Sequence, residues 1–311
     1  MNELYILNYL IFSVVAVLFV LEAGIALLSL FRYRHYREEI RKYLLPIWEI
    51  DGTFAGLYLV NFEITYPTLL GLVGQMYVAP LLVAGIFFIL RSIFLAYSEY
   101  TASPDKEELY VKIYSISTIV MVLIAGAVVT SGMSGIGVDV QSSAINLIAI
   151  FLNPFNILIM ISFFAASVFV VSSVFKVGQI YRYGIAFLAA AFFTVGIAIY
   201  AYLPADFATA LGNVALPGIL LALGIAAAIM QLRGIRFANT LTVLWLFASI
   251  NGIGIIAYPH IFGNINLAGF IATGAAVGPI MAITIVGGVL VIAALSFLIY
   301  LTYKRIEKTV Y

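Results

Sequence analysis

Long uninterrupted runs of apolar residues dominate the chain, and short polar stretches separate them. Nine of these runs reach the roughly 20 residues that one membrane crossing requires. The period-2 alternation typical of an outer-membrane barrel is missing, so each run is predicted to be a helix. The nine runs cover approximately 5–31, 50–70, 73–98, 110–131, 146–174, 183–203, 208–231, 239–259 and 273–303. The pattern predicts an all-α polytopic membrane protein of nine transmembrane helices in a single integral membrane domain, 1–311.

The fifth run contains a predicted break at Asn153-Pro154. Proline removes a backbone donor and disfavours a helical conformation in the residue before it. Residues 144–152 then form a half-span, and the lipid-crossing part begins near Phe155. Helices one to four and five to eight are expected to form two four-helix units of the same orientation, with helix nine added.

The positions of the basic residues predict the orientation of the chain. Of 15 lysines and arginines, Arg91 lies inside the third run, and nine crossings put the other 14 on one face. Under the positive-inside rule that face is cytoplasmic, so the N-terminus is outside and the C-terminus is cytoplasmic. The basic inner loop over 32–45 either sets topology alone or also contacts anionic lipid headgroups. The 14 residues are Arg32, Arg34, Arg37, Arg41, Lys42, Lys106, Lys112, Lys176, Arg182, Arg233, Arg236, Lys304, Arg305 and Lys308.

Composition supports this interpretation and excludes several kinds of chemistry. The 311 residues are 64% hydrophobic and 9% charged, which is typical of an integral membrane protein. Cysteine is absent, so disulfides and thiolate metal sites are excluded. The two histidines, His35 and His260, fall in predicted loops, and a haem held between two spans needs axial ligands within them. We therefore expect no haem bound by this chain, no metal site and no nucleic-acid partner.

Two ionisable residues lie deep inside predicted spans. Glu22 is ten residues before Arg32, which places it roughly 15 Å from the inner end of its helix. A carboxyl group at that depth is expected to be protonated, or to be paired with a cation or a water chain. Arg91 lies in the same half of the membrane as Glu22 and Glu49, so an ion pair between Arg91 and these two acids is expected, with snorkelling of Arg91 as the alternative. Ionisable groups in hydrocarbon usually mark a functional path.

Three further acids belong to the second run. Glu49 and Asp51 are expected to open its helix at the inner face, and Asp51 is interpreted there as an N-terminal cap. Glu63 follows Glu49 by 14 residues, within roughly 40° of the same helix face and roughly 21 Å further across. The Glu63 carboxyl group is expected either to form a helix–helix hydrogen bond or to lie at the far end of a polar track.

Several motifs in the first half resemble subunit II of the cytochrome bd-type quinol oxidases. The segment LEAGIALL (21–28) is similar to the family's GFDLGVGML-like motif, with Glu22 at the acid, and PIWEIDG (46–52) is similar to PxWDGN, with Trp48, Glu49 and Gly52. Tyr66-Pro67 is similar to a WP step of the family, and ILRS (89–92) is similar to an LILRG-like motif and contains Arg91. FLNPF (151–155), with Asn153 and Pro154, is similar to the family's LNPF segment. The spacings from Trp48 to Pro67 and from Pro67 to Arg91 fit the family without gaps.

The resemblance implies a function for the complex rather than for the chain alone. It implies a haem-free partner of subunit I, which carries haems b and d, oxidises quinol and reduces dioxygen to water. Small single-helix accessory subunits, membrane lipids and a bound quinone or lipid are further implied, in the cell membrane of a prokaryote. By position, the roles in a cytoplasmic proton path fall on Glu22, Glu49 and Arg91, with Asp51 and Glu63 as further candidates.

The chain also departs from the family pattern, and two other functions remain open. Both family aspartates are replaced by glutamate, and the asparagine and second tryptophan of the helix-two motif are missing. A proton-coupled small-molecule transporter would also use buried acids, with a substrate site at broken helices near mid-membrane. A purely structural membrane subunit with inert polar groups is the third interpretation.

Overall fold

The computed structural model describes residues 2–101, 103–139, 142–175, 183–202, 216–235, 237–258 and 266–309. Nearly all of these residues are helical, apart from a two-stranded antiparallel hairpin that pairs Val138 with Ile145 and Asp139 with Ala144. The elements, in chain order, are α1 Glu3–Arg32, η1 Tyr33–His35, α2 Arg37–Thr65, α3 Pro67–Met76, α4 Val78–Tyr100, α5 Pro104–Ser134, β1 Val138–Asp139, β2 Ala144–Ile145, α6 Leu147–Phe151, α7 Pro154–Phe175, α8 Gly184–Tyr202, α10 Leu216–Leu232, α11 Ala238–Ala257, η3 Leu267–Gly269, η4 Gly274–Ala276 and α12 Val277–Thr309.

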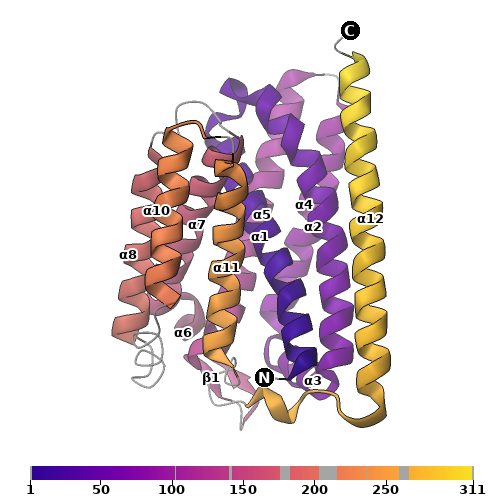
Figure 1. Ribbon diagram of the computed structural model, residues 1–311, viewed down its shortest axis with the longest axis vertical. Coiled ribbons are helices and arrows are strands. Elements are labelled where there is room, and N and C mark those ends of the chain that lie inside the picture. The colour runs from indigo at the N-terminus through magenta and orange to yellow at the C-terminus, as the bar shows by residue number, and fades with distance from the viewer. Residues whose placement is uncertain are drawn as a thin grey trace.

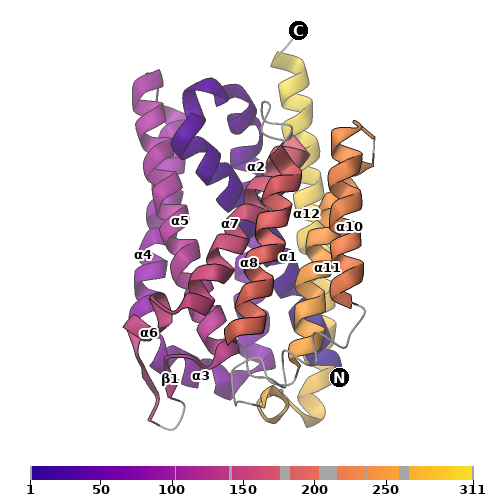
Figure 2. The same cartoon turned by 90° about the vertical axis from the view of Figure 1, so that its left-hand side faces the viewer.

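The long helices run side by side along the longest axis of the molecule (Figures 1 and 2). Six helical segments among the described residues are long and apolar enough to cross a membrane, and two apolar helices are shorter. The chain is therefore an all-α polytopic membrane protein; the count of nine crossings stays a prediction. The six segments are Glu3–His35, Val78–Tyr100, Pro104–Gly132, Pro154–Phe175, Ala238–Ile255 and Gly274–Ala293.

Helix α1 lies at the centre of the bundle. It packs against α2 and α5 on one side and against α7 and α11 on the other. The first four long helices, α1, α2, α4 and α5, contact one another, as do α7, α8, α10 and α11, while α12 packs mainly on α2. Gly24 permits the close approach of α1 to α7, because a Cβ there would lie 2.6 Å from the carbonyl oxygen of Ser167 in α7.

The helix boundaries differ from the sequence prediction in two places. Helix α2 begins at Arg37 rather than near residue 50, because the basic inner loop is itself helical and Pro46 is accommodated inside the helix. The predicted span 73–98 is broken at Tyr77, with α3 before it and α4 after it. Pro67 starts α3 at its first turn, where its missing N–H leaves no hydrogen bond unmade.

The predicted break at Asn153-Pro154 is confirmed. Helix α6 ends at Phe151 and α7 begins at Pro154. The Asn153 Oδ1 accepts a hydrogen bond from the backbone N–H of Phe155 at 2.7 Å, which satisfies a donor in the first turn of α7. The asparagine is therefore a helix-start signal as well as the residue before proline.

Apart from Arg91, the described basic residues gather at one end of the bundle, as predicted. They belong to the α1–α2 junction, the start of α5 and the ends of α10 and α12, which all lie at the top of Figures 1 and 2. Helix α1 begins at the opposite end, so α1 starts and α12 finishes on opposite sides. Lys176, Arg182, Arg236 and His260 lie outside the described residues.

At the end of the bundle where α1 begins, a polar chain holds three helices together. The Asn8 side-chain amide donates to Asn61 Oδ1 at 2.7 Å, and the Asn61 amide donates to Thr284 Oγ1 at 2.6 Å. All three side chains are buried. These hydrogen bonds link α12 to α1 and α2. The other described side chains of α12 are mostly exposed.

Candidate functional site

A buried ion cluster lies where α1, α2, α4 and α5 meet. The Arg91 guanidinium of α4 forms ion pairs with Glu22 of α1 and with Asp51 of α2, where Nη1 lies 3.0 Å from Oδ2. The hydroxyl of Tyr114 in α5 donates to Glu22 Oε1 at 2.7 Å. All four residues have no solvent-accessible surface. Four helices far apart in sequence therefore contribute one side chain each to a single network.

Aromatic rings enclose the guanidinium. The Arg91 Cζ lies 4.4 Å from the ring centroid of Phe88 and 5.7 Å from that of Phe19, both within cation–π range. These rings exclude water from the guanidinium and lower the local dielectric. Electrostatic interactions within the cluster are correspondingly strong.

The cluster has more acids than bases. With both carboxyls ionised it would carry a net charge of −1, and an uncompensated buried charge is expensive. One shared proton makes the cluster neutral. Three buried polar atoms, Asp51 Oδ1 and Arg91 Nε and Nη2, have no hydrogen-bond partner among the described residues. The cluster can therefore hold a proton and bind further polar groups or water.

The structure places Asp51, and not Glu49, in the ion cluster. Asp51 was expected to cap a helix start, and this is wrong, because α2 begins 14 residues earlier at Arg37 and Asp51 is paired with Arg91. Glu49 is only half-buried and lies outside the cluster. Two residues apart on a helix differ by about 200° in direction, so only one of the two acids can face Arg91.

Glu63 lies near the end of α2 and is exposed. Its helix position puts it within about 40° of Glu49 and about 120° from Asp51. Glu49 and Glu63 therefore share the outward side of α2, while Asp51 faces the bundle. Neither Glu49 nor Glu63 forms an ion pair with a described residue.

Two other motif residues of α2 flank the cluster. Trp48 donates from its indole N–H to Ser92 Oγ at 3.3 Å, next to Arg91 in sequence, and so joins α2 to α4. Gly52 has nothing within 4 Å of the position that a Cβ would occupy. The tryptophan helps to position α4, whereas no packing against the described residues requires the glycine.

Tyr114 is the cluster residue that the sequence prediction missed. A tyrosine within an apolar run resembles an interface anchor, and nothing local marks it as a partner of Glu22. The available signal is spacing, because Glu107, Val111 and Tyr114 follow one another at intervals of four and three on one face of α5.

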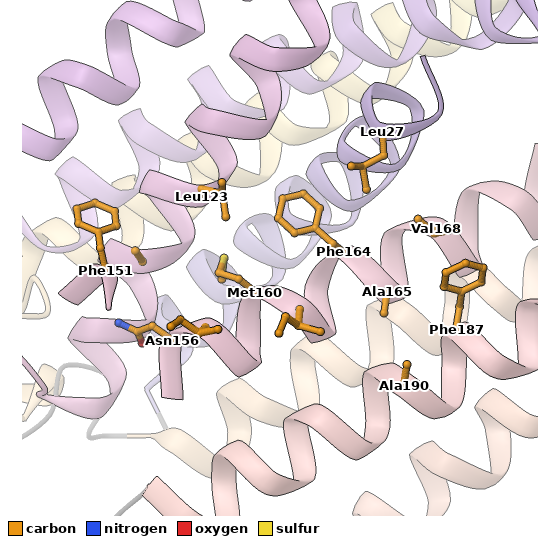
Figure 3. Close-up of a pocket in the computed structure, with 13 residues that line it drawn as sticks. Leu27, Leu123, Phe151, Asn156, Met160, Phe164, Ala165, Val168, Phe187 and Ala190 are labelled. Carbon is orange, nitrogen blue, oxygen red and sulfur yellow. The ribbon is translucent and has the colours of Figure 1, made fainter. Parts of the chain in front are cut away.

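An apolar pocket of about 680 Å³ opens between α5, α7 and α8, and Leu27 of α1 also lines it (Figure 3). Leu123, Met160 and Phe164 line it, and Asn156 contributes a polar side chain. The Asn156 amide donates to the Ile150 carbonyl at 2.6 Å, while its Oδ1 is buried without a partner. Among the described residues, no group of three or more His, Cys, Asp or Glu could hold a metal ion.

No protein-family model matches the chain, and no curated protein aligns with it significantly. A solved structure of the bd oxidase from Geobacillus thermodenitrificans superposes with a TM-score of 0.77. The chain has a bd-oxidase-like fold. The alignment covers 96% of this chain and 96% of that one, so the shared architecture spans both chains almost completely, at 16% identity.

Proposed function

We propose that this bd-oxidase-like chain is the haem-free subunit II of a cytochrome bd-type quinol oxidase in a prokaryotic cell membrane. The observation that carries the proposal is the buried Glu22–Asp51–Arg91–Tyr114 cluster inside a fold of this kind. In this arrangement nine helices cross the membrane, with the N-terminus outside and the C-terminus in the cytoplasm. The partner, subunit I, carries haems b and d, oxidises quinol and reduces dioxygen to water.

The cluster would serve the partner's chemistry by holding and passing protons. Reduction of dioxygen to water takes up protons. Two carboxyl groups that interact closely titrate as one unit. Beside the fixed charge of Arg91, the pair can take up one proton and release it again. Arg91 stabilises the ionised member, and the Tyr114 hydroxyl orients Glu22. We assign the helix-two acid of the path to Asp51 rather than Glu49, because Asp51 contacts Arg91.

Substitution of the two acids tests the proposal. Glu22→Gln and Asp51→Asn each remove an ionisable group while preserving size, and we expect quinol-driven oxygen consumption by the assembled complex to fall at least about tenfold. Glu49→Gln is the matched control on the other side of α2 and should retain most of the rate. Oxygen consumption that is unchanged in both cluster variants would contradict the proposal.

The apolar pocket is a candidate place for the quinone or lipid implied by the resemblance. Its volume lies within the roughly 300–1,000 Å³ typical of ligand pockets, and its lining suits an isoprenoid or acyl chain. The unpartnered Asn156 Oδ1 offers an acceptor for a hydroxyl group.

A transporter is less well supported. Its substrate site would need a broken helix near mid-membrane. The break between α6 and α7 lies toward the end of the bundle where α1 begins (Figure 2). The ion cluster, by contrast, lies between four continuous helices.

A further inference from the structure

Helices α1 and α5 are joined by polar contacts at two depths. At the cytoplasmic end the Tyr33 hydroxyl donates to Glu107 Oε1, and deeper in the bundle the Tyr114 hydroxyl donates to Glu22 Oε1. Tyr33 and Tyr114 also belong to one cluster of buried, mutually packed side chains. The two contacts are therefore the ends of one continuous interface.

Helical phase places the polar residues of this interface in line. On α1 and the turn after it, Ser29 and Tyr33 follow Glu22 by seven and eleven residues, within about 20° of its direction. On α5, Tyr114 follows Glu107 by seven residues, again within about 20°. We call these five residues, Glu22, Ser29, Tyr33, Glu107 and Tyr114, the α1–α5 seam.

Ser29 occupies the gap between the two ends. Its side chain has no solvent-accessible surface, and its hydroxyl has no partner among the described residues. Glu22 and Tyr33 both reach α5, and Ser29 lies between them in height, about 20° from the direction of Glu22 and about 40° from that of Tyr33. Its hydroxyl therefore faces the same interface. An unpaired buried hydroxyl at this point is suited to hold a water molecule that bridges the gap.

The cytoplasmic end of the seam is a buried carboxylate beneath solvent-accessible cations. The Glu107 side chain is 4% exposed, whereas those of Arg37 and Arg41 are 41% and 38% exposed. Arg37 Nε lies 2.9 Å from Glu107 Oε1, and Arg41 Nη1 lies 3.5 Å from Oε2. Arg41 also pairs with Glu99, and Arg34 and Lys112 pair with the neighbouring Glu108. Glu107 thus links the aqueous surface to the buried interface.

We propose that the α1–α5 seam is the route by which protons pass between the cytoplasm and the buried ion cluster. A proton taken up at Glu107 passes to the Tyr33 oxygen, then through water held by Ser29, to Tyr114 and to Glu22. Each hydroxyl or water oxygen accepts one proton and releases another, so every intermediate group regains its starting composition. The inference rests on the proposed function only in assigning the protons to oxygen reduction.

Two substitutions of the same shape isolate the Ser29 hydroxyl. Ser29→Thr keeps the hydroxyl, and Ser29→Val replaces it with a methyl group of nearly equal volume. The measurement is hydrogen–deuterium exchange of the protonated cluster carboxyl in the full-length protein. Its infrared band is identified by its loss in Glu22→Gln or Asp51→Asn. We expect exchange in Ser29→Val to be at least about tenfold slower than in Ser29→Thr, and similar slowing in Tyr114→Phe.

Ser115→Ala is the control, because the Ser115 hydroxyl donates to the Val111 carbonyl of its own helix. Equal exchange in the Thr and Val variants, or the lack of a carboxyl band lost in the acid variants, would overturn the seam proposal. If the Thr and Val variants exchange equally while Glu22→Gln still slows oxygen consumption, only the seam is wrong. If exchange differs but neither Glu22→Gln nor Asp51→Asn affects oxygen consumption, the seam stands and the proposed function fails.

Discussion

At the scale of single residues, the cluster shows how a fully buried arginine is tolerated. Arg91 compensates for burial with two carboxylates and two aromatic rings. The guanidinium is thereby the common partner of the two acids. Removing it leaves two carboxyl groups in a low-dielectric site without a cation.

The first residue-scale prediction concerns Arg91→Gln. Breaking a buried ion pair by removing one partner costs about 3–5 kcal/mol, so the free energy of unfolding should fall by about that amount. Thermal unfolding in detergent measures the loss. Adding Glu22→Gln and Asp51→Asn to Arg91→Gln removes the uncompensated charge and should recover much of the stability. An Arg91→Gln protein as stable as the parent would show that the cluster is not held together by charge.

At the scale of elements, close packing of α1 on α7 keeps Glu22 in position. Gly24 lies two residues from Glu22, and a Cβ there would lie 2.5 Å from Val171 Cγ2 and 2.6 Å from the Ser167 carbonyl oxygen. Backbone cannot move aside as a side chain can. The absence of a Cβ at Gly24 is therefore a condition for the observed depth of α1 in the bundle.

The element-scale prediction follows from this contact. Gly24→Ala forces α1 and α7 apart, and overpacking of this kind costs about 1–3 kcal/mol. Gly52→Ala is the matched control: a Cβ there meets nothing within 4 Å, and alanine favours the helix. Thermal unfolding should separate the two variants, with a loss of stability only for Gly24→Ala. Equal stability would mean that the helices repack without penalty.

At the scale of the whole molecule, the outward side of α2 is unusual for a surface facing lipid. It carries Glu49 and Glu63 together with Thr53, Gly56 and Val60. Acidic side chains are expensive against hydrocarbon, and small residues let another helix approach closely. Under the proposed function, this side of α2 is where subunit I packs.

The whole-molecule prediction uses two exposed glycines. Gly56→Leu should lower the amount of haem-bearing partner that co-purifies with a tagged chain, measured by the haem absorption spectrum, without unfolding the chain itself. Gly196→Leu on α8 is the control, because that glycine is also exposed with nothing within 4 Å and α8 lies on the far side of the bundle from α2 (Figure 1). Equal loss of partner in both variants would argue against α2 as the contact.

The sequence predicted the elements better than the site. The helical, membrane-spanning character and the break at Asn153-Pro154 follow from apolar run length and proline chemistry, which are local properties. The importance of Glu22 and Arg91 follows from the cost of charge in hydrocarbon. Helix α2 was misjudged because basic residues in its first turns resemble a loop, and this error made Asp51 look like a cap.

By itself, the sequence determined that the chain is a bundle of apolar helices with its basic residues at one end and buried acids and an arginine within. These properties depend on composition and on order along the chain. Only the tertiary structure decided that Asp51 rather than Glu49 faces Arg91, and that Tyr114 and Ser29 line one interface with Glu22. The rotation of each helix about its axis is decided by packing between segments far apart in sequence, as at Gly24 and Ser167, and local patterns do not encode that packing.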